Sequence, residues 1–263
     1  MSLRFAGKHC AIVGATGVIG SAIAKAFARE GAVISVLGRT ALEARSKLEP
    51  QLYPYKLLDN SGDIQKDRPS THQFVRLDVS NREDIKNVFG SRDDSVGPLD
   101  ILVNCAGISQ TTLLKRTPDE ELANIVDTNL LATILVCCII NVSSLMAIKG
   151  GLGATAYAAS KAGLVGFTRA LCREMAARSI RVNALLPGWV DTPMWSGCGY
   201  TVPKLMYNSI KDLKPELQQA YLKDTPLNRV ADPNEVAEAA VFLASNGYAN
   251  NCVLNLDGGL SAA

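Results

Sequence analysis

A tyrosine and a lysine four residues apart, Tyr157 and Lys161, are the side chains of this sequence best suited to acid–base chemistry. In a helix, positions i and i+4 share one face, so the phenol and the ammonium can converge on one point. A phenol ordinarily has a pKa near ~10, and a nearby cation favours the phenolate, so Tyr157 could exchange a proton near neutral pH. Such a pair suits the interconversion of a carbonyl and an alcohol.

The spacing alone is weak evidence, because it recurs at positions 200 and 204 and at positions 207 and 211. Only Tyr157 follows an apolar strand-like run, at 139–144, with a glycine-rich loop between them. A surface tyrosine beside a solvated lysine is the structural alternative. The setting favours the catalytic interpretation.

A glycine turn lies near the start of the chain. The apolar run 9–13 leads into Gly14, Gly17 and Gly20, and apolar positions then recur at helical spacing through 21–30. Strand, glycine turn and helix form the setting of a dinucleotide-binding fingerprint. Glycines let backbone N–H groups approach a pyrophosphate at the positive end of the helix. Thr16 is either a side-chain donor in this turn or a turn former.

The second strand-like run, 32–37, is followed by Gly38 and Arg39, where an acidic residue would bind the ribose of NAD. A guanidinium can pair bidentately with a 2′-phosphate, so we expect NADPH rather than NADH. A solvated loop cation is the alternative. After the third run, 73–78, Asp78 either faces the adenine or caps the next helix, expected at 80–89.

The fourth run, 99–103, is almost continuously apolar, as buried parallel strands are. Small and polar residues follow it at Asn104, Ala106 and Gly107, where a backbone must pass close to a ligand. A helix expected at 118–136 contains Asn129, and a buried amide there needs a partner. Either Asn129 binds a water in a proton relay to Lys161, or it is a satisfied core amide.

Strand-like and helical segments alternate along the whole chain. Further strand-like runs occur at 139–144, 180–186 and 252–256, and further helices at 41–48, 157–177 and 233–244. This alternation predicts an α/β fold in which residues 1–263 form a single-domain, Rossmann-type, doubly wound parallel sheet with helices on both faces. Residues 49–71 are interpreted as a surface insertion and 193–225 as a lid over the substrate.

Composition excludes several other classes. The net charge is +2 without a long basic run, so nothing indicates nucleic acid or an anionic membrane surface. The seven cysteines lack metal-ligand spacing and are interpreted as reduced thiols. His9 and His72 are expected at the surface, and no metal site or hydrolase triad is visible. No signal peptide or membrane span is apparent, so we expect the cytoplasm, with the mitochondrial matrix as an alternative.

Together these motifs resemble the short-chain dehydrogenase/reductase family, and most of all its 3-oxoacyl-acyl-carrier-protein reductases and related carbonyl reductases. The matching residues are Gly14 to Gly20, Asn104 to Gly107, Asn129, Ser144, Tyr157, Lys161, Pro187, Gly188, Thr192 and Asp257 to Gly259. The resemblance implies that Tyr157 is the general acid in reduction, that Ser144 holds the substrate carbonyl, and that Lys161 binds the nicotinamide ribose. It implies cofactor contacts from Gly14, Thr16, Gly17, Val18, Ile19, Gly20, Arg39, Thr40, Asp78, Val79, Asn104, Ala106, Gly107, Tyr157, Lys161, Pro187, Gly188, Val190 and Thr192.

The activity implied is NADPH-dependent reduction of a 3-oxoacyl thioester, on acyl carrier protein or coenzyme A, in fatty acid biosynthesis. One alternative is an NAD(P)-dependent reductase or dehydrogenase of free ketones, quinones, steroids or polyols. Another is a catalytically idle, cofactor-binding variant. For the acidic carrier, Arg178 matches a carrier-binding position of the family and Arg173 lies near it, although both would also fit a solvated helix end.

Two features depart from the family pattern. The glycines fall as G-x-x-G-x-x-G, whereas short members usually place the middle glycine one residue later, where this chain has Val18. The stretch from Asn129 to Ser144 is also short. Residues 130–138 supply only about 13 Å of helix at ~1.5 Å per residue, against a strand of about 20 Å. The short stretch, with its junction at Cys137 and Cys138, is interpreted as a splice form, a mis-joined gene model or a shortened variant. The resemblance implies a homo-oligomer, tetramer or dimer, and the missing part would hold the lower half of the helix that builds the family's subunit interface, so the association would be weakened.

Overall fold

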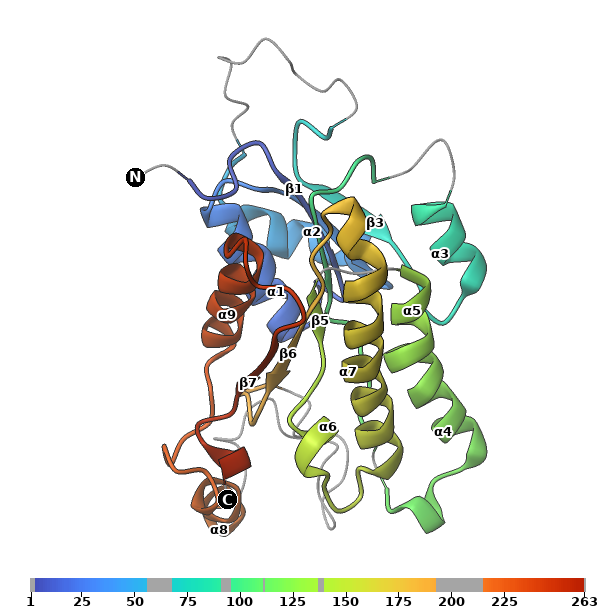
Figure 1. The fold of residues 1–263 in the computed structure, drawn as a ribbon, viewed down its shortest axis with the longest axis vertical. Coiled ribbons are helices and arrows are strands. Elements are labelled where there is room, and N and C mark those ends of the chain that lie inside the picture. Colours follow the sequence, from blue (N-terminus) through green and yellow to red (C-terminus); the bar gives the residue numbers. More distant parts are fainter. Residues whose placement is uncertain are drawn as a thin grey trace.

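The structure is a computed structural model that describes residues 3–55, 68–90, 96–110, 112–136, 140–192 and 215–262. One sheet has the strand order β3-β2-β1-β4-β5-β6-β7, and every neighbouring pair is parallel (Figure 1). The strands are β1 (His9–Val13), β2 (Val33–Gly38), β3 (Gln73–Arg76), β4 (Ile101–Asn104), β5 (Ile140–Val142), β6 (Asn183–Pro187) and β7 (Val253–Leu256). The strand order reverses between β1 and β4, as in a doubly wound Rossmann fold. The predicted fold class is confirmed.

Helices cover both faces of the sheet. They are α1 (Val18–Arg29), α2 (Ala41–Leu48), α3 (Arg82–Phe89), α4 (Asp119–Val126), α5 (Ala132–Val136), α6 (Met146–Lys149), α7 (Thr155–Met175), α8 (Pro215–Lys223) and α9 (Pro233–Ser245). On one face α1 packs beside α9, and on the other α3 packs beside α5 while α7 packs on α4 (Figure 1). No helix in the described ranges is long and apolar enough to cross a membrane.

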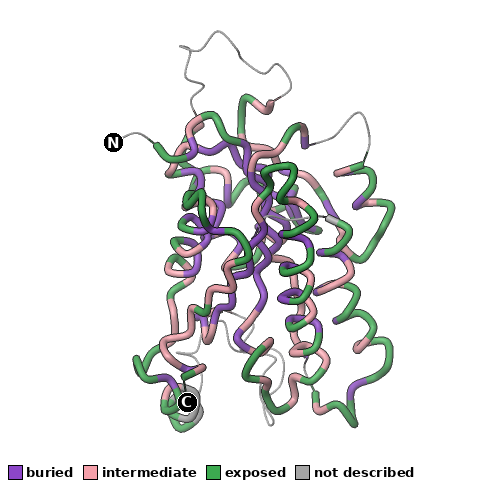
Figure 2. Tube along the Cα trace, viewed as in Figure 1, coloured by how far each residue is buried: buried purple, intermediate pink, exposed green. Residues whose placement is uncertain are grey.

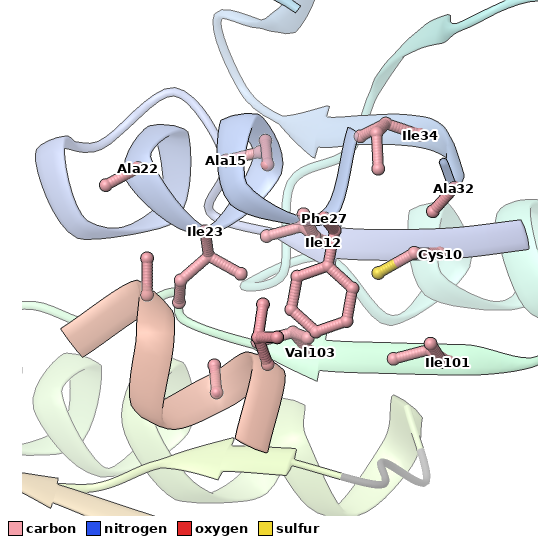
Figure 3. Close-up of a cluster of buried hydrophobic side chains, with 14 of the residues drawn as sticks. Cys10, Ile12, Ala15, Ala22, Ile23, Phe27, Ala32, Ile34, Ile101 and Val103 are labelled. Carbon is pink, nitrogen blue, oxygen red and sulfur yellow. The ribbon is translucent and has the colours of Figure 1, made fainter. Parts of the chain in front are cut away.

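The core follows the alternation of side chains along β1. Cys10 and Ile12 face α1 and α9, whereas Ala11 and Val13 face the cluster that includes residues of α3 and α5. Phe27 of α1 is fully buried and lies among the side chains around Ile12 (Figure 3). Buried residues run along the central strands, and exposed residues lie on the outer helices (Figure 2). A strand buried on both faces explains the continuous apolar run at 9–13.

The short crossover between β4 and β5 keeps its topology. A π-helical turn, Asp127–Leu131, joins α4 to α5. The junction at Cys137 and Cys138 lies outside the described residues. β5 has three residues, and it meets β4 only through Val103 opposite Ile140 and Asn104 opposite Asn141. The described part of β5 thus pairs with the end of β4 at the edge of the sheet where the expected site residues lie.

Two local expectations are wrong. The helix after β3 is capped by Asn81, whose side chain accepts hydrogen bonds from the backbone N–H groups of Glu83 at 2.9 Å and Asp84 at 3.4 Å, so Asp78 is not its cap. His9 is fully buried rather than exposed, because its ring lies 2.8 Å from the Pro98 carbonyl oxygen, in the segment that leads into β4.

The insertion and lid are only partly described. A 3-10 turn, Glu49–Gln51, opens the insertion, and residues 56–67 lie outside the described ranges. Of the lid, residues 193–214 also lie outside them, and α8 occupies most of the remainder.

Candidate active site

The glycine turn after β1 packs closely on the loop that follows β4. Gly14 has a φ of 82°, and a Cβ built there would lie 2.6 Å from the Ala106 backbone nitrogen. A Cβ on Gly20 would lie 2.9 Å from Ala15 Cα and would overlap the Gly14 carbonyl. These two glycines therefore let the turn fold onto itself and onto the Asn104–Gly107 segment.

Gly17 has a different position. It is the N-cap of α1, with an ordinary φ of −75° and no side-chain cap, and the atom nearest to a Cβ built there is the Gly14 carbonyl oxygen at 3.4 Å. The helix begins at Val18, three residues before the expected start, so the unusual glycine spacing places Gly17 at the helix terminus. The first backbone N–H groups of a helix lack intrahelical acceptors and carry a partial positive charge. The terminus at Val18, Ile19 and Gly20 is suited to an anion.

The ends of β2 and β3 bring the expected adenosine-binding residues together. Thr40 donates a hydrogen bond from Oγ1 to Thr16 Oγ1 at 3.2 Å, which joins the two turns. Arg39 is exposed beside them. A hydrogen bond from Ser80, with smaller contributions from nearby cations that include Arg39, lowers the pKa of the Asp78 carboxyl. Arg39 and Asp78 thus lie close together at the carboxyl ends of β2 and β3. Val79, the other residue expected there, is half-buried against the core.

Lys161 is buried beneath the end of β5. Its ammonium donates a hydrogen bond to the Val142 carbonyl oxygen at 3.0 Å, and Ser143 Oγ donates to the Lys161 carbonyl oxygen at 2.7 Å. Burial lowers the pKa of Lys161 to about 8. Lys161 Nζ lies 5.8 Å from the centre of the Tyr157 ring, so the two residues of the motif do converge.

Asn129 occupies the π-helical turn and is fully buried. Its Oδ1 accepts from Ile108 N at 2.8 Å, and its Nδ2 donates to Ile108 O at 2.9 Å and to Ser160 Oγ at 3.1 Å. The side chain is therefore a satisfied core amide, the alternative expected from the sequence. A Cβ on Gly107 would lie 3.2 Å from both Asn129 Oδ1 and Lys161 Nζ, so this glycine gives both side chains room. The proton relay stays a prediction.

Ser144 lies in the turn between β5 and α6, where its Oγ accepts from Met146 N at 3.2 Å. Tyr157 is in the first turn of α7, and α6 packs against α7. Figure 1 shows α6 and the start of α7 at the same end of the sheet. Ser144 thus comes from the turn after β5, whereas Tyr157 and Lys161 come from α7.

The end of β6 closes the site on its other side. Gly188 donates from N to Leu256 O at 2.8 Å, and a Cβ there would lie 2.7 Å from Asp257 Cα. Pro187 ends β6, and Val190 forms a parallel bridge with Ala231. Thr192 is the last described residue before the lid.

Three residues near the site had been assigned no role from the sequence. Gln110 is buried and accepts a hydrogen bond from α7. Ser160 accepts from Asn129, and Cys105 lies close enough to Lys161 for the ammonium to affect it, although burial raises the pKa of the thiol to about 11. Ser160 falls within the Tyr–Lys motif and Cys105 within the segment after β4, whereas no spacing in the sequence indicates Gln110.

The residues fit a nicotinamide dinucleotide. They lie at the carboxyl ends of β1, β2, β4, β5 and β6, across the point where the strand order reverses, which is where open α/β sheets bind dinucleotides. The α1 terminus offers N–H donors to a pyrophosphate. At the end of β4, buried Asn104 has an Nδ2 donor without a partner among the described residues.

Comparison with known proteins gives a consistent result. A family model described as enoyl-(acyl carrier protein) reductase matches residues 14–261. The 3-oxoacyl-acyl-carrier-protein reductase of Bos taurus is 35% identical over 266 residues, which cover 96% of this chain and 98% of that protein. The corresponding protein of Chlamydia muridarum is 33% identical over 276 residues, 99% of this chain and 100% of that protein. Carbonyl reductase family member 4 of Xenopus laevis is 32% identical over 266 residues, 96% of this chain and 98% of that protein.

Proposed function

We propose a specific reaction for this chain, which belongs to the short-chain dehydrogenase/reductase family and is an oxidoreductase acting on CH–OH or C=O groups. The proposed reaction is the NADPH-dependent reduction of 3-oxoacyl thioesters. The observation that carries the proposal is the placement of the Lys161 ammonium beneath the Tyr157 ring at the end of β5. The printed names of the Bos taurus and Chlamydia muridarum relatives support the substrate class.

NADPH, when bound, would supply the hydride for the keto carbon. Ser144 donates a hydrogen bond to the carbonyl oxygen, and Tyr157 gives that oxygen its proton. The Lys161 ammonium stabilises the phenolate that remains and binds the nicotinamide ribose. The N-terminus of α1 holds the pyrophosphate, and Arg39 pairs with the 2′-phosphate.

Within one subunit, the position of the basic residues favours a free or coenzyme A-linked substrate over a substrate bound to acyl carrier protein. The helix α7 has 21 residues and is about 30 Å long, with Tyr157 in its first turn and Arg178 beyond its last. Figure 1 shows that the end of α7 lies at the opposite end of the sheet from its start. Arg173 in the last turn and Arg178 just beyond it are therefore far from Tyr157 in the same subunit. A carrier docked at the site of one subunit would not reach them. This distance keeps reduction of free ketones as a second candidate.

We also infer a homo-oligomer. Val126, Ile134 and Leu135 on the α4–α5 helix are exposed, at 39%, 38% and 44%, and an interface would cover them. Light scattering of the purified protein measures its mass in solution.

Two measurements test the proposed function. Thermal unfolding with saturating NADPH, and with NADH beside it, checks cofactor binding, because a ligand at ~100 times its Kd stabilises a protein by ~2.7 kcal/mol. Turnover of acetoacetyl-coenzyme A, of the same acyl group on acyl carrier protein, and of a free diketone then compares the substrates, with Tyr157→Phe as the inactive control. A stabilising effect of NADPH without turnover of any carbonyl would identify an idle, cofactor-binding variant.

A further inference from the structure

Gln110 joins the loop after β4 to the start of α7. It is 4% exposed, and its Oε1 accepts a hydrogen bond from Ala156 N at 2.9 Å. Thr155 Oγ1 also donates to this oxygen, at 3.4 Å. Ala156 immediately precedes Tyr157, so Gln110 binds the backbone of the turn that carries the phenol.

The start of α7 depends on this contact because its own cap is poor. The N-cap residue of α7 is Ala154, which makes no side-chain hydrogen bond to the helix. The first N–H groups of a helix need partners outside it, and a Ser, Thr, Asp or Asn at the cap normally supplies one. The Gln110 amide oxygen takes this role from a residue 46 positions earlier in the chain.

Gln110 is itself held by a small polar cluster. Its Nε2 donates to the Thr112 carbonyl oxygen at 2.8 Å and to Thr117 Oγ1 at 3.3 Å. Thr117 is buried and donates from Oγ1 to Leu113 O at 3.0 Å. Because hydrogen bonds hold both the oxygen and the nitrogen of the Gln110 amide, the oxygen stays in place and keeps the first turn of α7 from fraying.

The same loop also contacts Asn129 through Ile108 and packs Gly107 beside Lys161. Lys161 is anchored separately, through Val142. The orientation of Tyr157 relative to Lys161 therefore depends on how the first turn of α7 is held. We propose that Gln110 is a positioning residue that sets the Tyr157 phenol against Lys161, an inference that rests on the proposed function.

The test compares three variants of the full chain. Gln110→Met keeps the length of the side chain and removes the acceptor, whereas Gln110→Glu keeps an acceptor for Ala156 N. Thr117→Val removes one partner of the Gln110 amide and leaves the bond to α7, so it is the matched structural control. For each variant kcat, KM, the Kd of NADPH and the Tm are measured with whichever of acetoacetyl-coenzyme A and the free diketone the wild type reduces.

The expected result is a kcat about 10- to 100-fold lower for Gln110→Met, with KM and the Kd of NADPH within about twofold of the wild type. Gln110→Glu recovers kcat to within about threefold. Thr117→Val lowers the Tm but keeps kcat within about twofold. A kcat of Gln110→Met equal to that of the wild type, or a loss equal to that of Thr117→Val, would overturn the inference.

A second readout needs no substrate. The pH at which the Tyr157 phenolate forms is followed by ultraviolet difference absorption, with Tyr157→Phe as the blank. We expect Gln110→Met to raise the midpoint by on the order of one pH unit, because the phenolate moves away from the ammonium. An unchanged midpoint contradicts the positioning role. A wild type that reduces only the diketone, or nothing, contradicts the proposed function while this readout still decides the role of Gln110.

Discussion

The Lys161 ammonium is hydrogen-bonded to the carbonyl oxygen of Val142, the last residue of β5, at 3.0 Å. β5 is only three residues long, yet its final carbonyl supports the side chain on which the site depends. The described end of β5 therefore provides the acceptor that fixes the Lys161 ammonium at the site.

Replacing Lys161 with Met should separate activity from stability. Burial lowers the pKa of Lys161 from the ordinary value of 10.5, as in the unfolded chain, to about 8, so at pH 7 burial of the ammonium costs roughly 3 kcal/mol, partly offset by its hydrogen bond. Lys161→Met should lower kcat/KM at least ~100-fold, while the free energy of unfolding at pH 7 stays level or rises. Turnover and urea unfolding measure both.

The exposed Lys86→Met is the matched control and should change neither quantity. In the wild type, between about pH 8 and 10.5, the unfolded chain binds more protons at Lys161 than the folded chain does. This group should therefore raise the free energy of unfolding across that window, a rise that Lys161→Met abolishes. Equal pH dependence in the two chains contradicts the burial of a charged lysine.

Arg39→Asp should reverse the choice of nucleotide. Arg39 is exposed near the Asp78 carboxylate, and loss of a charge-assisted pair with a 2′-phosphate should raise the Kd of NADPH about 10- to 100-fold. NADH should bind as well as before or better, because an acidic side chain can accept ribose hydroxyls. Fluorescence titration gives both constants. Lys47→Asp makes an equal change of charge on α2 and should leave the ratio of the NADPH and NADH Kd values unchanged.

Replacing Gly20 or Gly17 of the turn with alanine should have different effects on stability and on NADPH binding. Gly20→Ala forces a Cβ into the Gly14 carbonyl and should cost roughly 1–3 kcal/mol of stability. Gly17→Ala meets only ordinary contacts and should cost about 1 kcal/mol or less, yet weaken NADPH binding at least about tenfold because its methyl group lies at the helix terminus.

Gly166→Ala is the control: apart from the backbone of α7 itself, no atom of the described residues lies within 4 Å of the new methyl group, so the change should stabilise the chain by ~1 kcal/mol without affecting NADPH binding. If Gly17→Ala bound NADPH as tightly as the wild type, the α1 terminus would not be the pyrophosphate site.

Local patterns in the sequence predicted the strands and helices that position the site. The strand at 9–13, the helix at 41–48 and the convergence of Tyr157 with Lys161 follow from periodicity, and the structure has all three. These features depend on residues close together in the chain. The carrier-binding role that the resemblance implied for Arg178 stays a prediction, because α7 places this residue beyond the end of the helix that begins with Tyr157 in its first turn.

Contacts between distant segments could not be predicted in this way. Gln110 reaches α7 across 46 positions, and Asn129 reaches Ile108 across 21. Each depends on the hydrogen bonds of one side chain, which leave no period in the sequence. The burial of His9 likewise depends on Pro98, a residue of another segment.

His9 should make the protein sensitive to mild acid. Burial lowers the pKa of His9 below 6.5, opposed by the Pro98 carbonyl and by Asp100, whereas Arg68 lowers it further. Its Nδ1 donates to Pro98 O at 2.8 Å and its Nε2 lies 2.7 Å from Ser35 Oγ. Below pH 6.5 the unfolded chain binds a proton at this histidine that the folded chain does not, so the contribution of His9 to stability falls as the pH falls.

Urea unfolding between pH 5 and 8 tests this effect in the wild type and in His9→Gln. The difference in unfolding free energy between the two chains should level off above about pH 7.5, because His9 is then almost entirely neutral in both states. Below that pH it should change by up to ~1.4 kcal/mol per pH unit in favour of the variant, the value for one proton. Carboxylates common to both chains cancel in the difference. Parallel curves throughout would mean that His9 binds its proton equally well in the folded chain, and the buried contacts with Pro98 and Ser35 would then have to accommodate an imidazolium.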